Sequence, residues 1–204
     1  KNIQSHMKKP TIQETPPAEQ PKKTQGYFSA IKTEMIAREM SISDNTETGA
    51  RRPWKPNAEQ IAYWKAQEEH PWVYVAKPRQ VGLTTAATLS DVLWCTARDG
   101  DGDRARCAIV VDTEDKVRER MLLAADFARQ LMGTPLKQVT TERLVWPRGT
   151  ELIGLTAGGS RVGASMTYQR LHLSELPFWT NGEDTYAALM PSLTPGGQIV
   201  IEST

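Results

Sequence analysis

The stretch "VYVAKPRQVGLTTAA", residues 73–87, predicts three pieces of structure in a row. It opens on apolar and aromatic residues, continues through a run with a proline and a glycine, and ends on small and apolar residues. This order indicates a strand at 72–76, a tight loop, and a helix at 84–97. The loop would then lie at the carboxyl end of a strand, where α/β proteins bind ligands.

The loop has nearly the form of a phosphate-binding loop, G-x-x-x-x-G-K-[ST]. With Gly82 as the second glycine, Thr84 takes the hydroxyl position, but Leu83 stands at the lysine position and Lys77 at the first glycine. Backbone amides and the dipole of the following helix can still hold an anion. Either Lys77 or Arg79 could supply the cation. The stretch alone leaves a nucleotide site and an ordinary strand-turn-helix equally open.

Helical and strand patterns alternate from Trp54 onward. Besides the elements above, they predict helices at 57–68, 114–132 and 183–190, strands at 107–112, 142–146, 150–155, 168–173 and 198–202, and a glycine-rich loop at 157–164. Such alternation favours βαβ units and an α/β fold, with a mainly parallel sheet covered by helices on both faces.

The chain before Trp54 has a different composition. Residues 1–25 are polar and contain prolines, which predicts a disordered arm, and "SHM" within it resembles a cloning scar. Residues 26–53 are expected to form a helix at 27–40 and a linker. Phe28, Ile31, Met35 and Ile36 lie near helical spacing, so we expect this helix to pack on its own domain, with a partner-binding helix as the alternative.

Composition narrows the class of protein. The 204 residues carry a formal net charge of +1, which excludes a strongly basic nucleic-acid coat protein but leaves room for local DNA contacts. Cys95 and Cys107 are expected to be reduced core thiols. The three histidines are not clustered in the sequence, so we do not expect a structural metal site. No apolar run approaches the roughly 20 residues of a membrane span. We therefore expect a soluble intracellular protein.

Two later strands end in residues suited to nucleotide chemistry. "YQRLHLSE", 168–175, ends in Ser174 and Glu175, where many NTPases have an aspartate that assists Mg²⁺ and a glutamate that polarises water. Glu175 keeps the base position, whereas Ser174 could hold Mg²⁺ only through a water or weakly by its hydroxyl. His172 is expected to be a core histidine. "GGQIVIEST", 196–204, ends in the hydroxyl pair Ser203 and Thr204, which can sense a γ-phosphate.

The order of these motifs resembles the ATPase domain of large terminase subunits, the DNA-packaging motors of tailed bacteriophages. That family has an adenine-contacting glutamine, an R-Q-x-G loop, a catalytic glutamate and a Ser/Thr coupling motif. The matches are Gln60, residues 79–82, Glu175, and Ser203 with Thr204. Some members carry the loop lysine at its front, as Lys77 would. The resemblance spans 54–204 and implies a P-loop NTPase of the RecA-like (ASCE) class, a three-layer sandwich.

The resemblance also implies a set of roles. Glu175, Lys77 and Arg161 would be catalytic, with Arg161 reaching a neighbouring subunit's nucleotide; the alternative for Arg161 is a plain surface charge. Mg²⁺ would be held at Thr84 and Ser174, and Ser203 and Thr204 would couple hydrolysis to DNA movement. ATP would contact Gln60, Lys77, Pro78, Arg79, Gln80, Val81, Gly82, Leu83, Thr84 and Thr85.

The implied partners are double-stranded DNA, the portal and the small terminase subunit. The resemblance also implies a ring of copies when assembled, with a monomer as the alternative for the isolated chain. No contact with a membrane is implied. The implied location is the host cell cytoplasm, at the procapsid portal. The family's nuclease domain is not expected within these residues. Two rival functions stay open: a helicase-like nucleic-acid-stimulated ATPase, and a degenerate nucleotide-binding module without turnover. The displaced lysine and the serine at 174 count against the helicase.

Overall fold

The structure is a computed structural model that describes residues 29–43, 50–132, 136–159, 162 and 166–204. The predicted arm at 1–25 lies outside these residues. Within the described part, no helix is both long enough and apolar enough to cross a membrane.

A seven-stranded sheet forms the centre of the fold, in the order β3-β9-β8-β4-β7-β6-β5. The first five of these strands run parallel and the last two are antiparallel to their neighbours. Their bounds are β3 Trp72–Ala76, β9 Leu193–Ser203, β8 Tyr168–Ser174, β4 Arg106–Val111, β7 Glu151–Thr156, β6 Arg143–Val145 and β5 Gln138–Val139. The predicted mainly parallel sheet is confirmed, and β9 lies between the loop strand β3 and the strand β8 that leads to Glu175.

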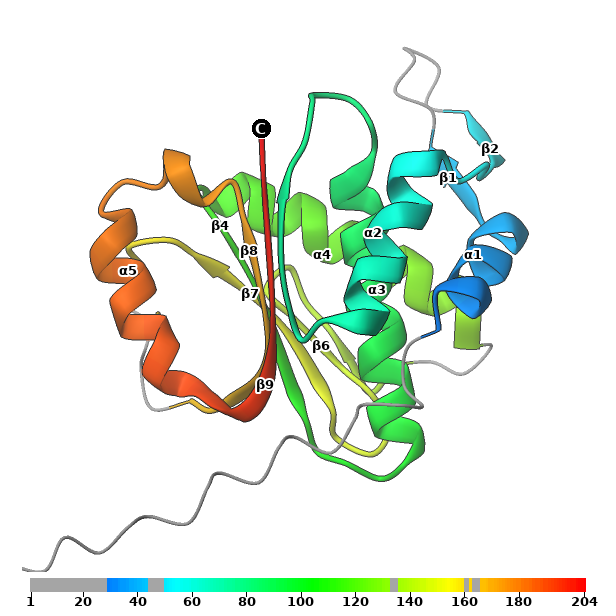
Figure 1. Ribbon diagram of the computed structural model, residues 1–204. Helices are drawn as coiled ribbons and strands as arrows, with labels where there is room; N and C mark the ends of the chain where they lie inside the picture. The colour runs from blue at the N-terminus through cyan, green and yellow to red at the C-terminus, as the bar shows by residue number, and fades with distance from the viewer. Residues whose placement is uncertain (1–28, 44–49, 133–135, 160–161, 163–165) are drawn as a thin grey trace, which may run out of the picture.

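Helices cover both faces of this sheet (Figure 1). On one face lie α2 (Ala58–Glu69), α3 (Leu83–Gly100) and α4 (Glu114–Met132), and on the other lies α5 (Gly182–Leu189). Short 3-10 turns at Leu176–Phe178 and Met190–Ser192 flank α5. The three-layer arrangement predicted from the alternation of elements is therefore confirmed.

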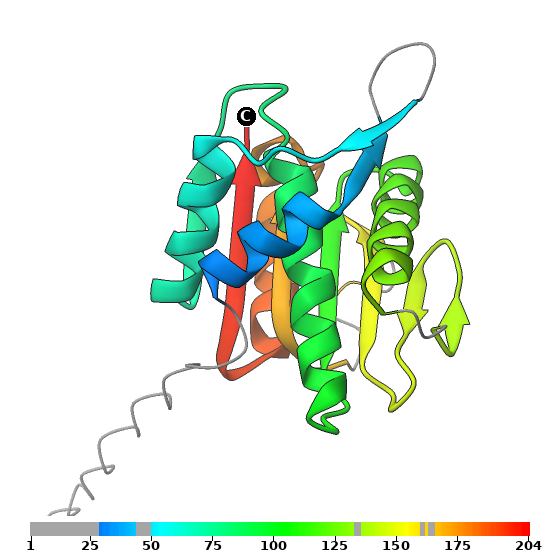
Figure 2. The same ribbon diagram turned by 90° about the vertical axis from the view of Figure 1, so that its right-hand side faces the viewer.

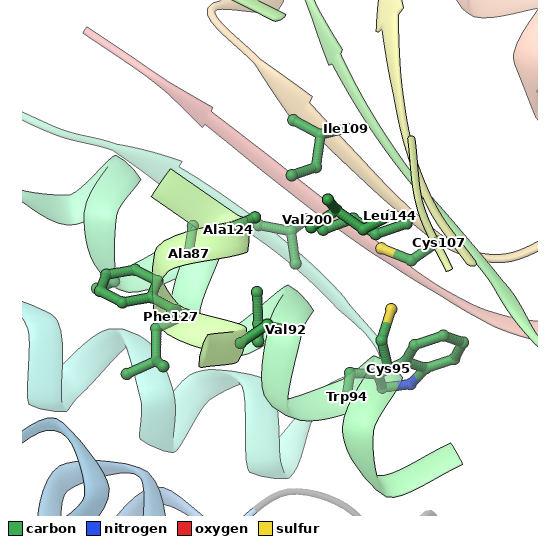
Figure 3. Packing of buried hydrophobic residues seen from close by; sticks show 14 of the residues in the cluster. Ala87, Val92, Trp94, Cys95, Cys107, Ile109, Ala124, Phe127, Leu144 and Val200 are labelled. Atoms are coloured by element: carbon green, nitrogen blue, oxygen red, sulfur yellow. The ribbon is translucent and has the colours of Figure 1, made fainter. Parts of the chain in front are cut away.

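The central strands are buried on both sides because each face has its own apolar cluster. Cys107 and Ile109 of β4 belong to the cluster under α3 and α4, and Cys107 lies beside Cys95 of α3 (Figure 3). The intervening residue Ala108, and Val110 after Ile109, belong to the cluster under α5. This alternation is the period of a strand with a hydrophobic layer on each side. Both cysteines are free and buried, as predicted.

The helix before the domain exists but presents a different face from the predicted one. α1 (Ala30–Glu39) packs against α2, and Figure 2 shows it on the outer side of the helical layer. Its buried residues are Ala30, Thr33 and Ala37, while Ile31 and Met35 are 69% and 63% exposed. The prediction that this helix packs on its own domain is confirmed, and Ile36 is partly buried against the core. The prediction that Ile31 and Met35 belong to the packed face was wrong. Phe28 lies outside the described residues.

The predicted linker contains two short strands that sequence patterns did not indicate. β1 (Ser41–Ser43) pairs antiparallel with β2 (Arg51–Pro53), and Arg51 forms a 2.8 Å ion pair with Asp126 of α4. Strands of three residues are too short to show a period. The described parts of 30–53 therefore contact the domain, and the boundary at residue 54 stays a prediction.

Candidate active site

The carboxyl ends of β3, β9 and β8 meet at one edge of the sheet. Figure 1 shows the chain end, marked C, beside the loop that leads from β3 to α3. A cavity of about 490 Å³ opens there. Its lining consists of Lys77, Arg79, Gln80, Thr84, Asp112, Lys116, Arg120, Glu175, Phe178 and Thr204. The predicted loop, base and coupling residues thus meet in one cleft.

The start of α2 holds the loop in place. Asn57 caps α2 in a capping box with Gln60, and its Nδ2 also donates to the Val81 carbonyl at 2.9 Å. Gln60 Nε2 donates to the carbonyls of Val81 at 3.2 Å and Gly82 at 3.0 Å. The two residues that start α2 therefore also fix the shape of the loop, because both loop carbonyls are turned toward them.

Gln60 lies behind the loop and not in the cleft. Its Oε1 accepts hydrogen bonds from Trp54 Nε1 at 3.2 Å and from the Asn57 amide at 3.1 Å, and the residue is 5% exposed. Both ends of its side-chain amide are thus engaged by the protein. The structure gives Gln60 a role in positioning the loop, and its contact with adenine stays a prediction.

Gly82 is required at the point where the loop enters α3. Its φ is +66°, a left-handed conformation, and a Cβ there would lie 2.7 Å from Gln60 Nε2. No side chain caps α3, and a hydrogen bond from the Ala86 amide to the Gly82 carbonyl, 3.1 Å long, closes its first turn. The amides of residues 83–85 therefore have no acceptor within the helix. Free amides at a helix N-terminus form a site for an anion.

Leu83 explains why the usual lysine position can be apolar here. Its side chain is 2% exposed and belongs to the core. Lys77 Nζ instead lies beside the loop, 3.0 Å from Glu175 Oε1 and 2.8 Å from Glu202 Oε2, and its role as the loop cation stays a prediction. Arg79 is exposed and lines the same cleft. Burial would lower the pKa of Lys77, but hydrogen bonds and charge from Glu202 and Glu175 raise it, so Lys77 is charged.

Glu175 is held by the end of the neighbouring strand. It follows β8 in a left-handed conformation with φ +57°, which is strained for a residue with a side chain. Its Oε2 accepts hydrogen bonds from Ser203 Oγ at 3.1 Å, the Thr204 amide at 3.0 Å and Thr204 Oγ1 at 3.1 Å. Burial would raise the pKa of Glu175, but the Thr204 amide and Lys77 lower it. Glu175 is therefore an ionised carboxylate in a fixed position.

Glu202 is one of the site residues that the sequence analysis did not identify. It is fully buried, and its Oε1 accepts a 2.5 Å hydrogen bond from Ser174 Oγ, while its Oε2 accepts a 3.3 Å bond from Thr84 Oγ1. Burial would raise its pKa, but hydrogen bonds and charge from His172, with bonds from Lys77 and Ser174, lower it to about 2. The sequence did contain a signal for Glu202, because a glutamate that follows the apolar run "IVI" is expected to be buried, and a buried charge needs charged or polar partners.

A chain of charges continues from Glu202 into the sheet. His172 Nε2 lies 3.6 Å from Glu202 Oε1, and His172 Nδ1 lies 2.6 Å from Asp91 Oδ2. Arg170 Nε donates to Asp91 Oδ1 at 2.7 Å. Burial favours the neutral form of His172, but Asp91 and Glu202 raise its pKa to about 9. His172 is a core histidine, as predicted, and a charged one.

The sequence analysis also did not identify three residues that line the cleft on the side of β4 and α4, namely Asp112, Lys116 and Arg120. Asp112 directly follows β4, and its Oδ2 forms a 2.7 Å ion pair with Lys116 Nζ in the first turn of α4. Lys116 and Arg120 both line the cleft. The signal available from the sequence was an aspartate directly after an apolar strand, since the ends of parallel strands share one edge of the sheet. The cleft thus has cations on both walls, which suits a polyphosphate.

The residues present fit Mg²⁺ only in part. Among the described residues, no three His, Cys, Asp or Glu side chains are grouped so that they could hold a metal. A loop hydroxyl, Thr84, does face a carboxylate, and Mg²⁺ is usually bound by one or two carboxylates together with substrate phosphates. Ser174 donates its hydroxyl to Glu202. Direct ligation by Ser174 stays a prediction, and Arg161 lies outside the described residues.

Comparison with known proteins identifies the fold. No protein-family model and no curated protein matches the sequence. Among solved structures, the chain is similar to the bacteriophage HK97 large terminase, with a TM-score of 0.66 and 11% identity over 87% of this chain and 38% of that one. It is also similar to a variant of the Thermus phage P74-26 large terminase ATPase domain, with a TM-score of 0.57 and 20% identity over 74% of this chain and 66% of that one. The chain therefore has the fold of phage large terminase ATPase domains, and it spans less than two thirds of either chain.

Proposed function

We propose that this chain is the ATP-hydrolysing motor domain of a phage large terminase subunit, which drives double-stranded DNA into a procapsid. The observation that carries the proposal is the position of Lys77, which lies between Glu175 and Glu202 beside the open N-terminus of α3. A cation, an ionised carboxylate and free helix amides are the parts that phosphoryl transfer requires. The fold shared with terminase ATPase domains supports the choice of this motor.

Each residue of the cleft has a role in this proposal. The amides of residues 83–85 hold the phosphates, and Lys77 neutralises their β and γ oxygens, with Arg79 at the rim. Mg²⁺, which the Thr84 hydroxyl would help to hold, would supply further positive charge to the phosphates. Glu175 accepts a proton from the attacking water and orients it. When Lys77 turns toward the phosphates it leaves Glu175 Oε1, and that oxygen becomes free for the water.

The last residues of the chain connect this chemistry to movement. Ser203 and Thr204 donate hydrogen bonds to Glu175 Oε2, so a movement of the Glu175 side chain would also move the end of β9. We propose that this contact transmits hydrolysis to the DNA-moving parts. Double-stranded DNA, the portal and the small terminase subunit are the proposed partners, at the portal in the host cytoplasm.

A ring of copies is proposed because Arg161 is expected to act on a neighbour's nucleotide. An arginine finger contributes roughly 10³ to 10⁵ in rate. Specific activity should rise with protein concentration, and a mixture of inactive Arg161→Ala and Glu175→Gln chains should regain part of it. A mixture as inactive as its components, under conditions in which wild type is active, would contradict the shared site.

Phosphate release with and without DNA tests the proposed function. Wild type should release phosphate faster when double-stranded DNA is present, without separating the strands. Strand separation would favour the helicase-like ATPase instead. Nucleotide binding without any release, at concentrations that allow assembly, would favour the degenerate binding module. Lys65→Ala, which removes an exposed lysine of α2, is the control and should behave like wild type.

A further inference from the structure

The carboxylate that assists Mg²⁺ in such ATPases is absent at Ser174, but another carboxylate reaches the same place. The register between β8 and β9 pairs Ser174 with Glu202. Residues paired across neighbouring strands point to the same face of a sheet. We propose that Glu202 is the metal carboxylate of this site and binds Mg²⁺ together with the Thr84 hydroxyl. The proposal rests on the proposed nucleotide-binding function.

The two oxygens of Glu202 have different surroundings. Oε2 faces the loop, 3.3 Å from Thr84 Oγ1 and 2.8 Å from Lys77 Nζ. Oε1 faces the protein, where Ser174 Oγ donates to it at 2.5 Å. In P-loop NTPases the metal is held by the loop hydroxyl and an acidic residue of a nearby strand. Oε2 of Glu202 is the carboxylate oxygen that stands beside the loop hydroxyl here.

The anchoring of Glu202 is what a metal ligand requires. Its side chain is fully buried, and His172 Nε2 lies 3.6 Å from Oε1. His172 is itself held by a 2.6 Å contact with Asp91. Partners behind a ligand fix its orientation and raise its affinity for the metal. Ser174 thus positions the ligand and is not a ligand itself.

Charge balance gives a second, independent reason. Lys77 now neutralises Oε2 of Glu202, and the same lysine is needed by the phosphates. If Lys77 turned to the phosphates without replacement, a buried carboxylate would lose its nearest cation, which is costly. A divalent cation beside Thr84 restores that charge. The metal and the lysine therefore exchange positions on Glu202 when nucleotide binds.

This exchange predicts that metal and nucleotide bind together. No described group of three acidic, histidine or cysteine side chains could hold the ion without phosphate oxygens. Isothermal titration of ATPγS into the full chain, in Mg²⁺ and in EDTA, measures the dependence. For wild type, Mg²⁺ should tighten binding by about tenfold or more. In Glu202→Gln, which keeps the shape of the side chain, affinity in EDTA should be at least that of wild type and the gain from Mg²⁺ should fall to less than about twofold.

Matched variants separate ligation from positioning. Ser174→Ala should keep part of the Mg²⁺ gain, and Glu202→Asp should keep more of it than Glu202→Gln. Ser174→Asp combined with Glu202→Gln returns the carboxylate to β8 and should restore the gain. A full Mg²⁺ gain in Glu202→Gln overturns the assignment of Glu202 and leaves the proposed function intact. Failure of wild type to bind ATPγS in either buffer overturns both.

A spectroscopic measurement avoids any loss of folding in Glu202 variants. Mn²⁺ with ADP is bound to chain labelled with ¹³C at the glutamate carboxyl carbons, in a Glu175→Gln background that removes the other nearby glutamate. Electron-nuclear double resonance should then show ¹³C directly coupled to Mn²⁺, because Glu202 is in the coordination sphere. Bound Mn²⁺ without such a coupling overturns the proposal.

Discussion

Thr204 donates two hydrogen bonds to one oxygen of Glu175, from its backbone amide at 3.0 Å and from its Oγ1 at 3.1 Å. The candidate base and the candidate coupling residue are therefore in direct contact. Ser203 Oγ binds the same oxygen at 3.1 Å. Because three donors converge on Oε2, only Oε1 of Glu175 is available to a water, and Lys77 occupies that oxygen in this structure.

Thr204→Val tests whether this contact positions the base. The substitution keeps the shape and the backbone donor but removes the hydroxyl, so Glu175 should lose orientation and not charge. ATP turnover should fall by about tenfold while ATP affinity stays near that of wild type. Thr180→Val, at an exposed threonine, is the matched control. Unchanged turnover in Thr204→Val would show that the backbone donor and Ser203 suffice.

Lys77→Ala tests the source of the loop cation. Loss of a charged hydrogen bond to the phosphates costs about 1.5–3 kcal/mol, so ATP affinity should fall roughly 10- to 100-fold. Arg79→Ala, at an exposed rim position, should have a smaller effect, and Leu83→Ala should lower stability because Leu83 is in the core. Equilibrium binding and thermal melts distinguish these outcomes. Wild-type affinity and turnover in Lys77→Ala would refute the relocated lysine.

Gly82→Ala tests the loop geometry. Alanine in the left-handed conformation costs about 1–2 kcal/mol. Its Cβ would also lie only 2.7 Å from Gln60 Nε2, so the Gln60 side chain would have to move. Both effects should lower the free energy of unfolding and weaken ATP binding. Gly100→Ala, at the end of α3, is the control because a Cβ there meets nothing within 4 Å. It should be neutral or stabilise by up to about 1 kcal/mol in urea denaturation. Equal losses in the two variants would contradict the tight-loop explanation.

Local sequence was sufficient for the elements that surround the cleft. The apolar run before the loop predicted β3 at its observed bounds, and the loop residues placed Gly82 at the start of α3. The ends of β8 and β9 could also be predicted to meet the loop, since parallel strands in such a sheet share one edge. For this reason Lys77 and Glu175 could be predicted to lie near each other, and both line the cleft.

What the sequence could not show depended on contacts between distant residues. The role of Glu202 follows from its register opposite Ser174, which no local pattern specifies. Gln60 was placed near the nucleotide by resemblance, but whether its amide points to the cleft or to the loop carbonyls is set by tertiary packing. α1 buried its small residues because a close helix contact outweighed the burial of Ile31 and Met35.

Single-turnover hydrolysis by wild type and Glu175→Gln is the most direct test of an ATPase in this cleft. Radiolabelled ATP is mixed with excess protein and double-stranded DNA, and both bound ATP and released phosphate are followed. Glu175→Gln keeps the shape but loses the base, so it should retain ATP with near wild-type affinity and hydrolyse it on the order of 10² times more slowly. Equal rates of hydrolysis in the two proteins, or no ATP retained by wild type, would contradict this assignment.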